Sequence, residues 1–337
     1  MSPQRSTSES QHITSADVAR VAGVSRTTVS FVLNDTPSSR VSDATKARVL
    51  AAAEELGYVP HAAARSLRAG RSDLVLLPAA VSAIGRLFSD WLDELETALD
   101  ARGYTVVLHG GRTADPVTAA RAWAQLRPAA VLDMTGGFLS AEAVQLLSRA
   151  GVRAVLTAAA APVDGVYTLV GDHAEIGAAA AEHLIARGRR RIGVLMPVER
   201  GLDAFAEPRL AGARAVAARH GATVTPLPLR YSDEAAAALA VLCRELGLDA
   251  LFGYNDEYAA LLSAALGDAG VTVPGDVAVV GADDLLLARV VRPRLTSVRH
   301  HLPDAGLVAE RVHQLVTVGS APPLPRIWFD VVARQSS

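Results

Sequence analysis

The chain has 337 residues, half of them hydrophobic, with a formal net charge of −2 and a single cysteine, Cys243. This length suits two or three domains, and no apolar run approaches the roughly 20 residues that a membrane span needs. One cysteine excludes a disulfide framework and a thiolate metal site. The polar start MSPQRSTSESQH predicts no secretory signal, so we expect a soluble, cytoplasmic protein without a membrane partner.

The two parts of the chain differ in charge. Residues 1–72 carry nine Lys and Arg against six Asp and Glu, a net charge of +3. The remaining 24 cations and 29 acids give −5. A basic N-terminal part on an acidic body indicates a part that meets a polyanion, although chance variation in surface charge could give the same difference.

Residues 1–59 predict three short helices. Thr14 is a suitable N-cap for the first, and Gly23 can take the positive φ that ends it. Ser25 can cap the second helix, which stops near residue 34, and Ser42 can cap the third. The third helix has an apolar stripe of Val49, Leu50, Ala53 and Leu56.

Two short helices joined by a tight turn, with a third packed across them, form a helix-turn-helix unit. In such a unit the second helix enters the major groove, and its N-terminal residues contact base edges. We therefore expect Arg26, Thr27 and Phe31 to be exposed because DNA is their partner. The alternative is an ordinary three-helix cap in which Phe31 is half-buried.

Residues 60–72 predict a separate linker. PHAAARSLRAG has helix-forming composition but too few apolar residues to pack on its own body. Leu67 lies between Arg65 and Arg68. An apolar side chain flanked by arginines is typical of a wedge that enters the minor groove and kinks the DNA at a base step. The alternative is a solvated linker with an incidental leucine.

Residues 73–337 alternate apolar runs with amphipathic helices, which predicts parallel sheets covered on both faces. Two such series of similar length indicate two doubly wound subdomains. We expect the chain to cross between them near residues 161, 291 and 320. In such folds ligands bind beyond the carboxyl ends of the strands.

The whole chain resembles the LacI/GalR family of transcriptional regulators from about residue 13 to residue 334. The resemblance rests on ITSADVARVAGVSRTTVSFVLN and VSDATKARVLAAAEELGYVPHAAARSL, and in the body on EHLIARGRRRIGVL, PRLAG, VPGDVAVVGADD and RPRLTSV. It implies a repressor with a helix-turn-helix head, a periplasmic-binding-protein-like body, and a homodimer on a palindromic operator. The DNA-binding residues that we carry over or infer are Thr14, Ser25, Arg26, Thr27, Thr28, Ser30, Phe31, Ser42, Arg65, Leu67 and Arg68.

The resemblance also implies a small-molecule effector between the subdomains. Arg209 and Asp283 match the family's polar clamp, and Tyr231 its stacking aromatic ring. The complete predicted set is Leu87, Phe88, Asp172, Arg209, Tyr231, Asn255, Asp256 and Asp283. Local roles are the alternatives: Asp283 capping a turn, Arg209 pairing with Glu207, and Tyr231 packing at a surface.

Several residues depart from the family pattern. Ala158 to Ala161 stand where relatives carry an aspartate toward the ligand, and Phe31 replaces a polar base-reading residue. The first departure predicts an apolar wall. We therefore expect a ligand with one polar edge and one apolar face, nucleoside-like or a modified sugar, rather than an ordinary hexose.

Enzyme motifs are missing from the sequence. There is no G-x-S-x-G elbow, no Walker loop, and no G-x-G-x-x-G after a strand, so we expect no enzyme and no cofactor. His300 and His301 are expected to start a helix and to point to different sides, which disfavours a metal site. The rival interpretation is a cytosolic small-molecule-binding or sugar-processing protein whose head serves only dimerisation.

Overall fold

The computed structural model describes residues 13–33, 41–59, 72–78, 85–110, 115–134 and 139–337. The chain divides into two compact units, residues 1–72 and 73–337. Each unit has its own buried core. In the part of the chain that the structure describes, no helix is both long and apolar enough to cross a membrane.

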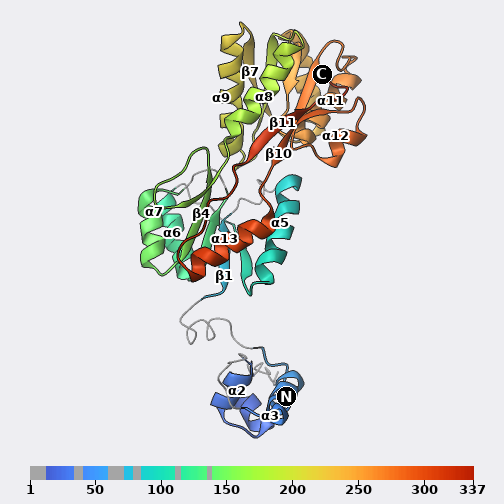
Figure 1. Cartoon of the computed structure of the whole chain (residues 1–337). Coiled ribbons are helices and arrows are strands. Elements are labelled where there is room, and N and C mark those ends of the chain that lie inside the picture. The colour runs from blue at the N-terminus through green and yellow to red at the C-terminus, as the bar shows by residue number, and fades with distance from the viewer. Residues whose placement is uncertain (1–12, 34–40, 60–71, 79–84, 111–114, 135–138) are drawn as a thin grey trace, which may run out of the picture. The chain divides into compact units, whose positions relative to one another are not determined.

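The first unit contains three helices, α1 (Ser15–Ala22), α2 (Arg26–Leu33) and α3 (Asp43–Glu55) (Figure 1). Asp17 accepts hydrogen bonds from the Thr14 backbone N–H at 3.0 Å and the Thr14 hydroxyl at 2.7 Å. Gly23 ends α1 in the left-handed conformation, with φ 65°. These contacts confirm the predicted start and end of the first helix.

The core of this unit is small. Its buried residues are Val18, Ala19, Ala22, Val29, Val49, Ala52 and Ala53. Leu50 was expected in this stripe, but its side chain is 53% exposed. Leu50 is one helical position, about 100°, around from Val49, and the narrow face of α3 buries Ala52 and Ala53 instead.

The second unit has two lobes, each built on a parallel sheet, which confirms the predicted doubly wound fold. In the first lobe the strand order is β2-β1-β3-β4-β5. Its strands are β1 (Leu74–Pro78), β2 (Thr105–His109), β3 (Ala130–Asp133), β4 (Ala154–Ala159) and β5 (Tyr167–Val170). Helices α5 (Arg86–Asp100) and α13 (Ala305–Thr317) pack together, and so do α6 (Pro116–Gln125) and α7 (Ala141–Arg149).

The second lobe has a six-stranded sheet with the order β11-β10-β9-β8-β6-β7, in which β11 is antiparallel to β10. The strands are β6 (Arg191–Pro197), β7 (Thr223–Leu229), β8 (Ala250–Phe252), β9 (Ala278–Ala282), β10 (Thr296–His301) and β11 (Trp328–Val332). The helices are α8 (His173–Ala186), α9 (Asp203–Arg219), α10 (Asp233–Glu245), α11 (Asp256–Asp268) and the short α12 (Leu286–Val290).

The chain crosses between the lobes later than the sequence suggested. The crossings lie between β5 and α8, between β10 and α13, and just before β11, instead of near residues 161, 291 and 320. The first difference arises because β5 adds an edge strand to the first sheet, pairing with β4 from Tyr167 onward. The last arises because Ile327 donates its backbone N–H to Val170 in the first lobe.

The two histidines expected to start a helix end strand β10 instead. His300 and His301 pair in register with Phe329 and Trp328 of β11. The parallel neighbour β9 pairs only with Thr296–Val298, and the antiparallel pairing with β11 carries the strand on through both histidines.

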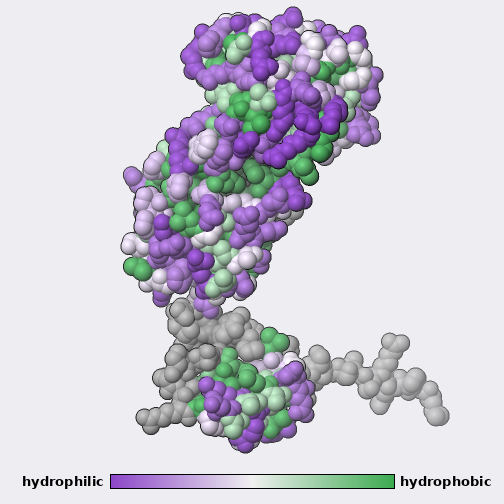
Figure 2. All heavy atoms as spheres, turned by 45° about the vertical axis from the view of Figure 1, so that its right-hand side comes forward, coloured by the Kyte–Doolittle hydropathy of each residue, from purple (hydrophilic) through white to green (hydrophobic). Residues whose placement is uncertain are grey.

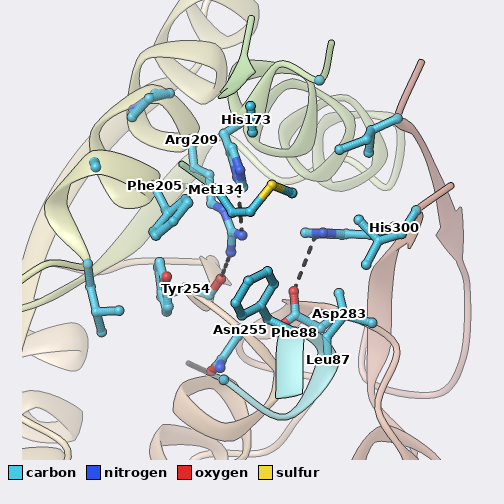
Figure 3. A pocket seen from close by; sticks show the side chains of 18 of the residues that line it. Leu87, Phe88, Met134, His173, Phe205, Arg209, Tyr254, Asn255, Asp283 and His300 are labelled. Carbon is cyan, nitrogen blue, oxygen red and sulfur yellow. Dashed lines mark hydrogen bonds and ion pairs between the residues drawn. The ribbon is translucent and has the colours of Figure 1, made fainter. Parts of the chain in front are cut away.

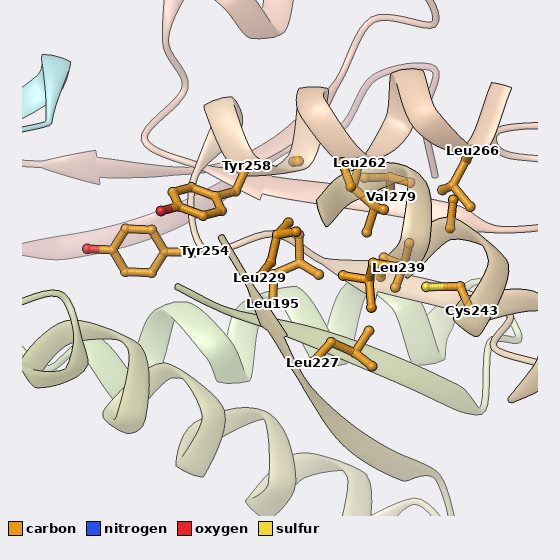
Figure 4. Close-up of a cluster of buried hydrophobic side chains, with 14 of the residues drawn as sticks. Leu195, Leu227, Leu229, Leu239, Cys243, Tyr254, Tyr258, Leu262, Leu266 and Val279 are labelled. Atoms are coloured by element: carbon orange, nitrogen blue, oxygen red, sulfur yellow. The ribbon is translucent and has the colours of Figure 1, made fainter. Parts of the chain in front are cut away.

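The second lobe is packed around a cluster of leucines between its sheet and helices α10 and α11 (Figure 4). Tyr254 and Tyr258 stand at the edge of this cluster, with their hydroxyls pointing away from the leucines. On the face that Figure 2 presents, hydrophilic residues cover most of the surface and hydrophobic ones form separate patches. Such separate patches are ordinary for a folded domain.

Helices α8 and α9 approach each other closely through two glycines. A Cβ atom on Gly177 would lie 1.7 Å from the carbonyl oxygen of Arg209, and one on Gly212 would lie 1.9 Å from that of Ala174. The two helices can therefore pack in this way only when both positions lack a side chain. This contact fixes the backbone of Arg209.

We expect Gly177→Ala to lower the free energy of unfolding by about 1–3 kcal/mol, because the added methyl group forces the two helices apart. Gly267→Ala in α11 is the matched control, since no atom lies within 4 Å of its added Cβ. The control should stabilise the protein by up to about 1 kcal/mol through helix propensity. Urea unfolding measures both, and equal changes would contradict the close contact.

Candidate functional site

The second unit encloses a cavity of about 490 Å³ between its two lobes. Its wall is formed where parallel strands end: Pro78 ends β1, Met134 follows β3, Ala159 ends β4, and Tyr254 and Asn255 follow β8. This is where a ligand site is expected in a doubly wound fold. We call this cavity the cleft.

The two walls of the cleft differ in chemistry. The first lobe and its crossing segments, apart from Asp172, present only apolar side chains and glycine among the residues described. They are Leu77, Pro78, Gly85, Leu87, Phe88, Met134, Ala158, Ala159, Ala160, Gly171, Leu302 and Ile327. The predicted apolar wall is therefore present, and it includes the first turn of α5 with Leu87 and Phe88.

The polar groups come from the second lobe, and Arg209 is at their centre (Figure 3). Its side chain is buried and donates a hydrogen bond to the carbonyl oxygen of Tyr254. A second guanidinium nitrogen lies 3.4 Å from Nδ1 of His173, and the guanidinium carbon is 4.7 Å from the centre of the Tyr254 ring. The alternative pairing with Glu207 is not formed.

Asp283 also faces the cleft. It has φ +95°, and its backbone N–H donates to the carbonyl oxygen of Val298 at 2.8 Å. One carboxylate oxygen lies 3.3 Å from Nε2 of His300. That nitrogen is buried and makes no aligned hydrogen bond, and neither does Nε of Arg209. Buried polar nitrogens of this kind cost free energy unless a partner bonds to them.

Burial shifts the pKa values of the ionisable groups in this part of the cleft. Burial, assisted by the charge of Arg209, lowers the pKa of His173 to about 3. The same two causes lower the pKa of His300 well below its ordinary value. Both imidazoles are therefore neutral at pH 7, and Arg209 is the cation of the described cleft wall.

The remaining predicted residues divide between the cleft and the core. Tyr231 lines the cleft and is 53% exposed, with its ring centre 5.0 Å from that of Tyr258. Asp172 and Asn255 line the cleft and also cap helices, accepting from the backbone N–H groups of Ala174 at 2.8 Å and Tyr258 at 3.0 Å.

Asp256 requires a correction, because its carboxylate lies in the core and not in the cleft. It accepts hydrogen bonds from the Ser297 hydroxyl at 2.6 Å and the Leu285 N–H at 2.7 Å. Burial raises its pKa to about 8, although the bond from Ser297 opposes this shift. Neighbouring positions at the start of α11 point in different directions, so only Asn255 of the pair reaches the cleft.

The sequence also left several cleft residues unassigned: His173, Glu199, Phe205, Tyr254, Glu257, Tyr258 and His300. They lie at strand ends and in first helical turns, where a polar residue has many ordinary roles. If residues 296–301 are read as a strand, the alternation of side chains between its two faces separates His300 from His301 and identifies His300 as a candidate cleft residue.

In the first unit, the predicted base-reading residues lie on one helix. Arg26 and Thr27 occupy the first turn of α2 and are exposed, and Phe31 is 40% exposed. Ser30 is half-buried. Phe31 therefore does not belong to the core of this unit, against the alternative of an ordinary cap.

Three other predicted residues hold helix ends. Ser25 accepts from the Thr28 N–H at 3.0 Å and lies 2.9 Å from the Thr28 hydroxyl. Ser42 accepts from the Thr45 N–H at 3.4 Å. These contacts cap the N-terminal ends of α2 and α3, as the contacts of Thr14 with Asp17 do for α1. Arg65, Leu67 and Arg68 lie outside the described residues.

Comparisons with known proteins cover both units. Residues 14–61 match the family model of bacterial regulatory proteins of the lacI family, and residues 181–337 match a periplasmic binding protein-like domain. The chain is 30% identical to the HTH-type transcriptional regulator GalR of Escherichia coli, over 92% of this chain and 90% of that protein. It is 31% identical to the ribose operon repressor of the same species, over 88% of this chain and 90% of that one.

A solved structure agrees with these matches. A LacI-family transcriptional regulator from Silicibacter pomeroyi has a TM-score of 0.78 and 25% identity, covering 96% of this chain and 99% of that one. The similarity therefore includes the head and the two-lobed body.

Because the pKa of Asp283 is raised, we expect this carboxyl group to lower the free energy of unfolding in a pH-dependent way. Burial raises this pKa to about 6, and Arg209 opposes the shift. Between about pH 4 and pH 6 the folded protein holds a proton here that the unfolded chain releases, so the carboxyl costs stability as the pH rises. Asp283→Asn should remove this cost, and its stability relative to the unaltered protein should grow by up to about 3 kcal/mol over this window.

Urea unfolding at a series of pH values measures this difference. The control is Asp268→Asn, at an exposed position in α11. The free energy of unfolding of Asp283→Asn should exceed that of the unaltered protein by more at about pH 6 than at about pH 4. An equal difference at the two pH values would contradict a raised pKa at Asp283.

Proposed function

This chain belongs to the lacI family of bacterial regulatory proteins, and we propose that it represses transcription as a homodimer on a palindromic operator, under the control of a small molecule in the cleft. The observation that carries the proposal is the presence, in one chain, of a capped helix-turn-helix with exposed Arg26, Thr27 and Phe31 and of a two-lobed body with a lined cleft. A binding protein or an enzyme that needed its head only for dimerisation would have no use for such a helix. Because its target is bacterial DNA, we also propose a cytoplasmic location.

The exposed residues of α2 suit direct reading of base edges. The first turn of a recognition helix is the part that reaches them, and it carries Arg26 and Thr27 here. An arginine can donate two hydrogen bonds to a guanine. Phe31 can contact a thymine methyl group but cannot donate a hydrogen bond, so we propose a thymine at that operator position.

The linker supplies the second proposed contact with DNA. Leu67 between Arg65 and Arg68 has the composition of a minor-groove wedge, in which the apolar side chain separates two base pairs and the arginines hold the phosphates. This part of the proposal rests on the sequence and on family membership.

Ligand control requires that the ligand bind one arrangement of the lobes better than the other. The two walls of the cleft belong to different lobes, and a ligand held by the second lobe would gain contacts with the first as the lobes close. We propose that this closure changes the spacing of the two heads in the dimer. The predicted polar clamp of Arg209 and Asp283 is the part that would recognise the ligand.

Footprinting of the purified protein on the region upstream of its own gene tests the function. With the operator in hand, Arg26→Ala should weaken specific binding by about 1–3 kcal/mol, because a pair of hydrogen bonds to one base is lost. Binding to random DNA should hardly change. Arg48→Ala in α3 is a charge-matched control that should leave the ratio of specific to random binding unchanged; an equal loss on both DNAs for Arg26→Ala would show a phosphate contact only.

The wedge is tested separately. Leu67→Ala should reduce operator affinity and also the bend of the bound operator, since the group that separates the base pairs is removed. Circular-permutation gels measure the bend, with Leu67→Met as the variant that keeps an apolar wedge. An unaltered bend with Leu67→Ala would exclude intercalation at this residue.

A further inference from the structure

The cleft contains more negative charge than its cation can balance. Its described lining includes four carboxylates, Asp172, Glu199, Glu257 and Asp283, against the single guanidinium of Arg209. The charge of Arg209 acts on Asp283. The other three carboxylates form no ion pair with a described Lys or Arg.

Two of these carboxylates, Glu199 and Glu257, both interact with Tyr231. Glu199 accepts hydrogen bonds from the Tyr231 N–H at 2.9 Å and from the Tyr258 hydroxyl. Burial raises the pKa of Glu199, but these two bonds, its own backbone N–H and the charge of Arg230 together lower the pKa, so the side chain stays ionised. Glu257 accepts from the Asn255 amide at 3.3 Å and acts electrostatically on Tyr231.

Three tyrosine rings gather at the same end of the cleft. The ring centre of Tyr258 is 5.0 Å from that of Tyr231 and 5.7 Å from that of Tyr254. The faces of aromatic rings are negative and attract cations, and grouped rings form the sites that bind ammonium groups. Ionised carboxylates next to the rings strengthen this attraction.

Two buried nitrogens of the cleft give an independent observation, since Nε of Arg209 and Nε2 of His300 make no aligned hydrogen bond. The His300 side chain is 7% exposed, and its Nε2 points toward the Asp283 carboxylate at 3.3 Å (Figure 3). A buried polar atom facing a cavity of about 490 Å³ is accounted for when a ligand fills the cavity. The carboxylates therefore line the same cavity as these buried nitrogens, and Tyr231, which is 53% exposed, stands at its open end.

The facing wall limits the rest of the ligand. Leu87, Phe88, Met134 and Ala159 offer no hydrogen-bonding side chain, so a polar ligand surface placed against them would lose its bonds to water without replacement. An apolar ligand surface would instead gain from burial there.

We propose that the ligand of this cleft is an amphipathic amine, with its cationic group beside Tyr231, Tyr258, Glu199 and Glu257 and its apolar body against the first lobe. The inference rests on the proposed function in taking the cleft as the effector site. It excludes carboxylates and phosphates, which the excess of carboxylates in the cleft would repel. It also narrows the modified-sugar and nucleoside-like classes to members that carry a positive charge.

The test uses the full-length protein and three series of small probes. Each series keeps one apolar body, benzyl, cyclohexylmethyl or naphthylmethyl, and varies the head group among ammonium, hydroxyl and carboxylate. The methylene carbon keeps each amine an alkylammonium ion that is charged at pH 7. Binding is measured by calorimetry, and release of operator DNA is measured in parallel. The ammonium member of a series should bind roughly fivefold or more tightly than its hydroxyl analogue, and the carboxylate member most weakly.

Variants then assign the preference to the proposed end of the cleft. Glu257→Gln should lower amine binding by about fivefold while leaving the alcohol unchanged. Glu245→Gln, at an exposed position in α10, is the matched control and should change neither. A polar but uncharged residue on the facing wall, introduced as Ala159→Asn, should weaken the amine and the alcohol alike, because their shared apolar body loses its contact.

The outcomes separate this inference from the proposed function. Carboxylates that bind best, equal binding of the three head groups, or no binding by any amine would overturn the amine class. If carboxylates bind best and release the operator, the regulatory function stands and only the ligand class is wrong. If amines bind in the cleft with the expected order but never alter operator binding, the ligand class stands and ligand control of the repressor is wrong.

Discussion

The buried guanidinium of Arg209 connects the packing of the second lobe to the chemistry of the cleft. Its backbone is fixed because Gly177 of α8 lies against its carbonyl oxygen. Its side chain reaches the strand end at Tyr254 and the first residue of α8, His173. A buried charge is costly unless it is bonded and balanced, and here a carbonyl oxygen, an aromatic face and the charge of Asp283 share that task. The close helix contact and the polar centre of the cleft are therefore one arrangement.

The direction of Asp283 depends on the residues around it. Asp283 and Asp284 both have positive φ, an unfavourable backbone for residues with a side chain. Asp284 is buried and bonded to Arg299 at 3.0 Å and to Arg334, while Asp256 accepts the next backbone N–H, that of Leu285. These bonds hold the turn on both sides, so Asp283 points into the cleft. Asp256 and Asp284 support the site from the core without contacting a ligand.

Local rules predicted the parts of this protein that local contacts determine. Thr14, Ser25 and Ser42 marked the three helix starts, and the alternating apolar runs gave both lobes. The sequence could not give the lobe crossings, because the edge strand β5 is only four residues long and is defined by its pairing with β4. Arg209, Tyr231 and Asp283 were found through the family pattern. His300 and Glu199 were not. His300 reaches the cleft because it belongs to strand β10, and Glu199 lies in a loop that bonds to Tyr231 and Tyr258, which are distant in sequence.

The division of the cleft into a polar and an apolar wall has a consequence for how the lobes could close. In a cleft with polar groups on both sides, closure depends on matching hydrogen bonds across the ligand, and one missing bond costs about 1–3 kcal/mol. Among the described lining residues, the polar side chains belong to the second lobe and to the crossing residue Asp172, so they can bind a ligand while the lobes are open. Closure then gains mainly from burying Leu87, Phe88 and Met134 against the ligand body, which contributes about 25 cal/mol for each Å² removed from water. In such a cleft the head group of the ligand decides whether it binds, and the size of its apolar body decides how strongly it favours the closed arrangement.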